Sequence, residues 1–192
     1  MFKIKSILFL FIVILFSGCA ATPNMDHSVY GGDVSKPDPG KALVIFMRPS
    51  RLGFIINSAV YDDEKFIGMV PYQSQLAYMA EPGTHRFMVI SEAADFMNAE
   101  LVAGKTYYAI VTPRMGVWRA RFSLAPVTSG QLTQPEFKQW LAEAKFIKNT
   151  ESAYAWDKAN HGSVLEKKTE YLAAWMQKPE AERPFLRKED GR

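Results

Sequence analysis

Cys19 is the residue whose chemistry stands out, because it is the only cysteine among 192 residues. A lone thiol excludes an internal disulfide framework and any zinc site built from several thiolates. A thiolate is also a far better nucleophile than a serine hydroxyl near neutral pH, so this side chain can form a thioether. Two small residues, Ser17 and Gly18, precede it.

The segment before Cys19 has the pattern of a secretory leader. Lys3 and Lys5 give it a positive start, and residues 7–16 are an uninterrupted apolar run. These ten residues are too few for a permanent membrane span, which needs about 20. Small residues follow the run where a membrane anchor would have a stop-transfer pattern. We therefore predict a signal peptide over residues 1–18.

The end of this leader, Phe16-Ser17-Gly18-Cys19, resembles the lipobox of bacterial lipoproteins, although Phe16 stands where the family usually has leucine. In that family the leader is cleaved before the cysteine, the thiol receives a diacylglycerol, and the new amino group is acylated. The resemblance implies cleavage between Gly18 and Cys19, lipidation of Cys19, and anchoring to a membrane by acyl chains. By resemblance to the sorting rules of Gram-negative lipoproteins, Ala20 in place of aspartate favours the periplasmic face of the outer membrane over the inner membrane.

Composition divides the rest of the chain into four parts. Residues 19–40 hold three prolines, three glycines and no periodicity, and are expected to be the acylated N-terminus and a flexible tether. Residues 41–128 alternate short apolar runs with turn residues, which is typical of strands. Residues 129–178 show helical spacing, and residues 179–192 are charged and interrupted by proline, so we expect an extended or disordered tail.

The strand-rich part predicts the fold class. About ten residues separate one apolar run from the next, without a helical segment between them, as in an antiparallel sandwich or barrel. Trp118, Ala120, Phe122 and Leu124 give the clearest alternation. We expect a mainly β chain with a helical C-terminal extension: a small antiparallel β-sandwich of seven to eight strands plus two to three helices.

Five short motifs follow one another in this part of the chain. They are Val44–Arg48 with Pro49-Ser50-Arg51, Val60-Tyr61-Asp62, Ile67-Gly68, Pro82-Gly83-Thr84-His85, and Ala103-Gly104-Lys105-Thr106-Tyr107-Tyr108. In this order they resemble a recurring bacterial lipoprotein domain, the domain of unknown function numbered twenty-eight forty-six. The resemblance covers about residues 40–127 and implies a sandwich similar to PEGA and prealbumin-like domains, located in the cell envelope. It implies no catalytic residue, cofactor or ligand.

The helical extension carries two capping-box patterns, Thr133 with Glu136 and Ser163 with Glu166, and Gly162 between them suggests a helix end. Three of the four tryptophans lie here: Trp140, Trp156 and Trp175. Docking of the helices is the main interpretation of these tryptophans. An exposed aromatic surface for a partner protein or a glycan is the alternative.

Few residues point to catalysis, and we predict no enzymatic activity, no catalytic residue, no metal site and no cofactor. His27, His85 and His161 are far apart in the sequence, and Met47, Met69, Met79 and Met88 sit singly in apolar strands. Asp62, Asp63 and Glu64 fall in a short turn, where solvated carboxylates are expected. Arg114, Arg119 and Arg121 form either a solvated face or an anion site.

Charge and anchoring together predict the class of function. The formal net charge is +3 for the whole chain and +1 once Lys3 and Lys5 are removed, which gives no electrostatic signature of nucleic-acid binding. We expect a non-enzymatic interaction or structural module that contacts the membrane through its lipid and meets an envelope protein. The alternative is a binding protein for an envelope glycan or other small ligand, and the oligomeric state stays open.

Overall fold

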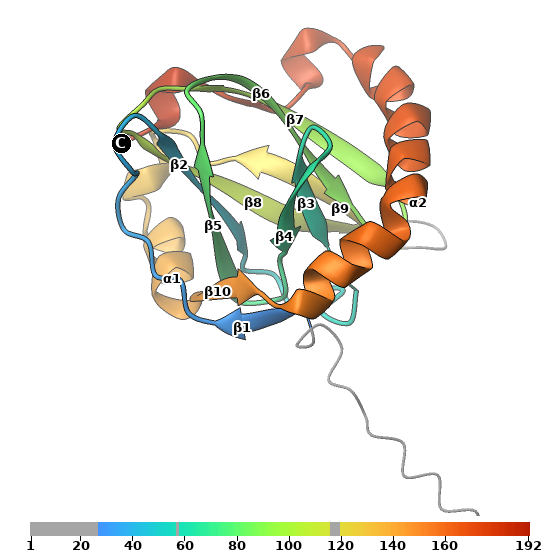
Figure 1. The fold of residues 1–192 in the computed structure, drawn as a ribbon. Helices are drawn as coiled ribbons and strands as arrows, with labels where there is room; N and C mark the ends of the chain where they lie inside the picture. The colour runs from blue at the N-terminus through green and yellow to red at the C-terminus, as the bar shows by residue number, and fades with distance from the viewer. Residues whose placement is uncertain (1–26, 57, 116–119) are drawn as a thin grey trace, which may run out of the picture.

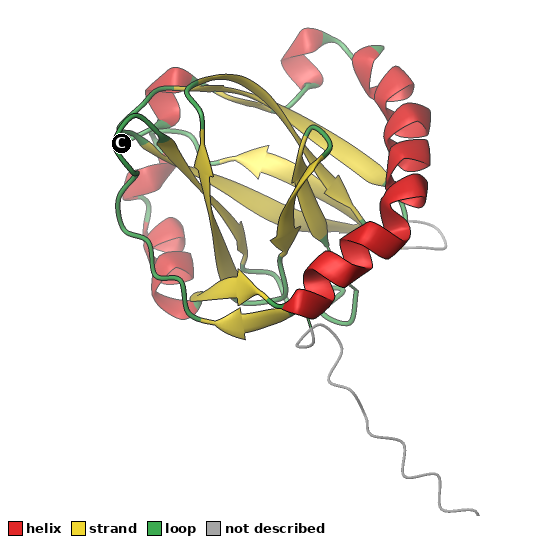
Figure 2. Ribbon diagram, viewed as in Figure 1, coloured by secondary structure: helices red, strands yellow, loops and turns green. Residues whose placement is uncertain are grey.

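The computed structural model describes residues 27–56, 58–115 and 120–192, and shows two facing β-sheets with a helix outside each (Figures 1 and 2). The six-stranded sheet has the order β1 (Ser28–Tyr30), β10 (Lys145–Asn149), β5 (Ser74–Ala80), β2 (Ala42–Arg48), β8 (Thr106–Met115), β9 (Ala120–Pro126). The five-stranded sheet has the order β11 (Phe185–Leu186), β7 (Ala94–Leu101), β6 (Gly83–Ile90), β3 (Ala59–Asp62), β4 (Lys65–Met69). The α-helices are α1 (Pro135–Glu143) and α2 (Glu151–Met176), and the 3-10 helices are η1 (Gln131–Thr133), η2 (Glu180–Glu182) and η3 (Lys188–Asp190).

Both sheets are mixed, which corrects the expectation of an antiparallel sandwich. β2 is parallel to β8, β10 is parallel to β5, and β11 is parallel to β7. Turn patterns in a sequence reveal hairpins, whereas parallel neighbours need long crossover connections and leave no local signal. The coarser prediction agrees with the structure, which is mainly β with its helices in the C-terminal part.

The number of strands agrees with the prediction for residues 41–128, where the structure has the eight strands β2 to β9. Three further strands come from segments for which no strand was expected: β1 from the predicted tether, β10 from the predicted helical extension and β11 from the predicted tail. Each pairs at the margin of a sheet, β1 on β10, β10 on β5 and β11 on β7. These strands have only two to five residues, which is too short for the alternation of apolar and polar residues that identifies a strand in a sequence.

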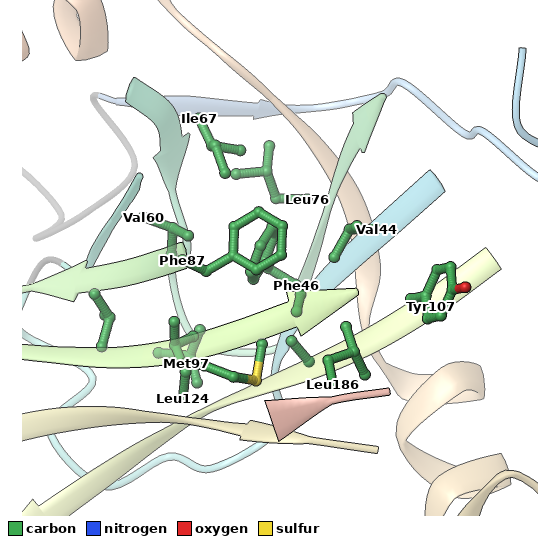
Figure 3. Packing of buried hydrophobic residues seen from close by; sticks show 14 of the residues in the cluster. Val44, Phe46, Val60, Ile67, Leu76, Phe87, Met97, Tyr107, Leu124 and Leu186 are labelled. Atoms are coloured by element: carbon green, nitrogen blue, oxygen red, sulfur yellow. The ribbon is translucent and has the colours of Figure 1, made fainter. Parts of the chain in front are cut away.

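The central core lies between the two sheets (Figure 3). Phe46 of β2 and Phe87 of β6 meet there edge to face, with ring centroids 5.1 Å apart and an angle of 80° between the rings. Such an arrangement places the positive edge of one ring against the negative face of the other. The core therefore joins the sheets through the middle strands of both.

β2 is apolar on both faces, and this explains the helix outside its sheet. Alternate side chains point into the central core (Ala42, Val44, Phe46) and to the outer face (Leu43, Ile45, Met47). α1 covers the outer side chains with Phe137, and Tyr108 of β8 packs against the same ring. Burial of one such large apolar side chain stabilises a fold by about 1.5–3 kcal/mol, so an uncovered outer face would be costly.

α2 does the same for the five-stranded sheet. Its Ala153, Val164 and Trp175 are buried against an outer sheet face that includes Tyr61, Met88 and Phe96. Met88 and Ile90 face α2, while Phe87 and Val89 face the central core, as alternation along β6 predicts. The molecule thus has four layers: α1, two sheets, and α2.

The helix boundaries differ from those predicted. α1 is N-capped by Gln134 rather than Thr133, and α2 runs unbroken through Gly162, so Ser163 and Glu166 lie inside the helix. Glycine costs a helix interior only about 1 kcal/mol. Packing of α2 on both sides of this point, through Ala153 and Trp175, outweighs that cost.

The C-terminal segment 179–192 is ordered, in contrast to the prediction of an extended or disordered tail. Leu186 is fully buried in the central core, and the Asp190 carboxylate accepts hydrogen bonds from the backbone N–H groups of Ser129 (3.0 Å) and Arg187 (2.9 Å). One apolar anchor and one buried carboxylate are enough to fix the segment, although its composition is charged.

The approach of β4 to β10 yields a stability prediction. A Cβ at Gly68 would lie 2.7 Å from Leu76 Cδ2 and within contact distance of the Asn149 amide, which itself donates to Ile67 O (2.8 Å). Gly68→Ala should therefore lower the free energy of unfolding by about 1–3 kcal/mol, measured by chemical denaturation. Gly130→Ala, where nothing lies within 4 Å, is the matched control and should change it by less than about 0.5 kcal/mol. Equal effects of the two substitutions would contradict this account of the β4–β10 contact.

Candidate functional site

Several of the predicted site residues fall outside the part of the chain that the structure describes. Gly18 and Cys19, predicted for cleavage and lipidation, are among them, as are Trp118 and Arg119. Within the described part, neither α-helix is both long enough and apolar enough to cross a bilayer.

The three histidines have separate surroundings. His27 Nδ1 lies 3.1 Å from Ser152 Oγ, His161 is exposed on α2, and His85 lies on β6 beside Asp62 of β3. In residues 27–56, 58–115 and 120–192, no three His, Cys, Asp or Glu side chains come close enough together to hold a metal ion.

His85 and Asp62 form the closest pair of titratable groups that would suggest acid–base chemistry. His85 Nδ1 is 2.8 Å from Asp62 Oδ2, and Nε2 is 2.8 Å from the carbonyl oxygen of Glu81. Both neighbours are acceptors, so the protonated ring can donate to each of them, and the hydrogen bond to Asp62 raises the pKa of His85. In this arrangement both ring nitrogens are occupied by acceptors of the chain itself, and the pair links β3 to β6.

The carboxylates of the β3–β4 turn are also engaged. Lys168 of α2 reaches both of them, with Nζ 2.6 Å from Asp63 Oδ1 and 2.8 Å from Glu64 Oε1. The remaining turn carboxylate, Asp62, accepts a hydrogen bond from the Tyr78 hydroxyl (2.8 Å). These contacts link α2 and β5 to the turn.

The tryptophans and methionines are mainly packing residues. Trp175 of α2 is buried against Phe96, and Trp156 of α2 packs against the same cluster of side chains. Trp140 belongs to α1 and packs on the outer face of the six-stranded sheet. Of the four methionines that the sequence analysis names, Met47, Met69 and Met88 are fully buried, and Met79 packs on the core beneath α1. The interpretation of these methionines as core residues is confirmed.

A groove of about 670 Å³ lies between strand β9 and the C-terminal segment. Residues 123–126 of β9 form one wall, and residues 180–185 together with Arg187 form the other. Three arginines border it, Arg114 from β8 and Arg183 and Arg187 from the C-terminal segment, together with Glu180 and Glu182. β9 is the last strand of its sheet, so one of its edges has no strand partner within the described residues. We call this feature the β9 groove.

A smaller pocket of about 160 Å³ shares Arg114 with the β9 groove. Arg121 faces Arg114 directly across the β8–β9 pair, and Lys178 lines the same pocket. Like charges at directly opposed positions are unfavourable. Asp95, whose Oδ2 is 3.6 Å from Arg114 Nη2, offsets only part of this charge. Burial raises the pKa of the Asp95 carboxyl, and the Arg114 charge counteracts that effect.

The two hollows can therefore bind anionic groups and, in the groove, an extended chain. Sequence reasoning identified Arg114 and Arg121 as a cluster on one face, and the structure places them in register. It did not find Lys178, Arg183 or Arg187, because these lie more than 50 residues away and no local pattern links them to β9. No family model, curated protein or solved structure matches this chain.

The His85–Asp62 pair makes stability depend on pH. Because the folded pKa of His85 is raised above the ordinary value of about 6.5, its stabilisation is complete below that pH and is lost as pH rises through the folded pKa. His85→Phe keeps a ring beside Phe87 but removes both donors. Denaturation from pH 5.5 to 8.5 should show a wild-type advantage that shrinks as pH rises, and Asp62→Asn should reduce it. An advantage that does not change with pH would contradict this assignment.

Proposed function

We propose that this chain is a non-enzymatic, lipid-anchored lipoprotein of the cell envelope that binds a segment of a partner protein in the β9 groove. The anchor is the acylated Cys19, and the location is the periplasmic face of the outer membrane. Two or more acyl chains give stable attachment without a spanning helix. Anchoring keeps the domain in a thin layer and so raises its effective concentration toward other envelope components.

The observation that carries the proposal is the groove beside β9, a strand whose outer edge has no hydrogen-bonded neighbour among the described residues. A strand without a neighbour on one edge offers backbone N–H and C=O groups to an incoming extended segment, and side-chain pockets then select its sequence. The wall opposite β9 consists of residues 180–185 and Arg187, which are held in place by Leu186 in the core. Since β11 lies close beside β9, a partner segment would enter the groove where residues 180–184 line it, rather than between β9 and β11.

The charges suggest which segment would fit. Arg183 stacks on Trp175, with its guanidinium carbon 5.5 Å from the ring centroid, and its Nε is buried without a hydrogen-bond acceptor. Arg114 and Arg187 stand at the same groove, so carboxylates of a partner would find several donors. We therefore expect an extended partner segment that carries acidic side chains.

A small anionic ligand is the second candidate. The pocket that holds Arg114, Arg121 and Lys178 has three cations against the single carboxylate of Asp95. A glycan site built from exposed tryptophans has less support, because those side chains pack on the sheets. Retention of a small anion by the native protein, lost in Arg121→Glu but kept in Arg187→Glu, would favour this candidate.

Site-specific photocrosslinking in the native envelope tests the groove. A photoreactive residue in place of Ala125 should capture a distinct partner protein, and the same residue in place of Lys138, exposed on α1, should not. Capture from position 125 should fall several-fold in the Arg114→Glu/Arg187→Glu variant, while Lys158→Glu on α2 leaves it unchanged. Capture at both positions alike, or capture that ignores the arginines, would refute a binding role for the groove.

A further inference from the structure

Exposed apolar side chains are concentrated at one end of the molecule. Eight large apolar side chains among the described residues are more than a third exposed. Six of them belong to three segments: Val29 and Tyr30 of β1, Leu52, Phe54 and Ile55 of the loop after β2, and Tyr154 of α2. In Figure 1 the loop after β2 and the starts of β1 and α2 all lie at the lower end. We call this the lower apolar end.

Hydrogen bonds connect these segments. Ser28 of β1 pairs with Asn149, whose amide donates to Ile67 O (2.8 Å). Val70 follows β4 in the chain, and its carbonyl oxygen accepts a hydrogen bond from Arg48 Nη1 (3.3 Å). These contacts link β1, β10, the end of β4 and Arg48 to one another, so these parts of the chain lie at the same end of the molecule.

Arg48 keeps the loop after β2 in this position. Its guanidinium is fully buried, with its central carbon 4.3 Å from the centroid of the Phe122 ring, and it donates to Ile56 O (2.9 Å) and to Gly53 O. No carboxylate of the described residues pairs with it, and burial lowers the pKa of Arg48 to about 10, so it remains charged at neutral pH. The carbonyl groups of the loop are therefore its counter-dipoles.

This clamp determines where the loop side chains point. With the backbone at 53 and 56 held by Arg48, Ile56 packs on the central core, while Leu52, Phe54 and Ile55 are about half exposed (50, 47 and 59%). Gly53 has φ +67°, a conformation that favours glycine and sharpens the turn. The loop thus presents its apolar side chains to the outside at a fixed place.

The start of β1 indicates what covers this end. Eight residues lead from Cys19 to His27, and a fully extended chain of that length reaches at most about 28 Å. A domain of this size is about 40 Å across. If Cys19 carries the anchor, the spacer is shorter than the domain, and the end where β1 begins is the end nearest the bilayer.

We propose that the lower apolar end inserts into the interface of an anionic phospholipid bilayer, with Leu52, Phe54 and Ile55 as the penetrating side chains. The orientation rests on the lipid anchor of the proposed function, but the contact itself does not require acyl chains. Tyr30 suits the headgroup level, and Arg51, Lys145 and Lys148 supply positive charge for anionic headgroups, beside the acidic Glu151. Acyl chains and loop together would fix how the β9 groove faces the periplasm.

A dye placed on the intact lipoprotein tests this contact. Acylation consumes the Cys19 thiol, so Ile55→Cys would supply the only free thiol for an environment-sensitive dye. In vesicles of phosphatidylethanolamine with about a quarter phosphatidylglycerol, the dye at position 55 should shift to the blue and be quenched by a quencher on the lipid chains. Val102→Cys, also apolar and exposed but at the opposite end of β2, is the matched control and should show neither effect. A dye at 55 that behaves like the control would overturn the proposal.

A second measurement separates this proposal from the anchor. The chain 19–192 with Cys19→Ala keeps every described residue, and it should bind the same vesicles weakly. Replacing Leu52, Phe54 and Ile55 by serine should reduce that binding about tenfold or more, with unchanged circular dichroism. Binding unaffected by the serines would refute the loop contact. Labelling of the wild-type protein at Cys19 would show a free thiol and refute the anchor, while the vesicle result still decides the loop.

Discussion

The structure depends on the burial of both faces of strand β2. Its seven residues, Ala42–Arg48, are all buried, so neither side of the strand can face water. The five-stranded sheet covers one side and α1 covers the other. Strand β6 also has apolar side chains on both faces, and α2 covers its outer face. Four layers follow from this single requirement, and even the polar last residue of β2, Arg48, is buried and used to hold a loop.

Much of the fold was predictable because local sequence patterns determine it. Alternation along β6 and the continuous apolar run of β2 identify strands buried on one or both faces, and the eight strands of residues 41–128 follow from such patterns. The predictions that were wrong concern segments whose structure depends on residues far away in the sequence. β10 and β11 form strands because they pair with β5 and β7. α2 continues through Gly162 because its packing on the five-stranded sheet offsets the cost of a glycine in the helix.

The residues of the candidate site were likewise predictable only where a local pattern links them. Arg114 and Arg121 are seven residues apart, and the hairpin between β8 and β9 explains why sequence reasoning could group them. The opposite wall of the β9 groove comes from residues 180–187, a segment whose composition suggested disorder until Leu186 was seen in the core. Arg48 gave no signal either, since a buried arginine without a carboxylate is visible only once its carbonyl partners are placed.

Anchor, lower apolar end and β9 groove make up one account, in which the domain is held at a bilayer and presents a binding edge away from it. The proposed acylation of Cys19 is its central element, and the mass of the mature protein purified from envelopes tests it most directly. The account predicts a chain that begins at Cys19 and is heavier than its 174 residues by a diacylglyceryl group and an additional acyl chain. A mature chain that retains residues 1–18, or a Cys19 with an unmodified thiol, would contradict it.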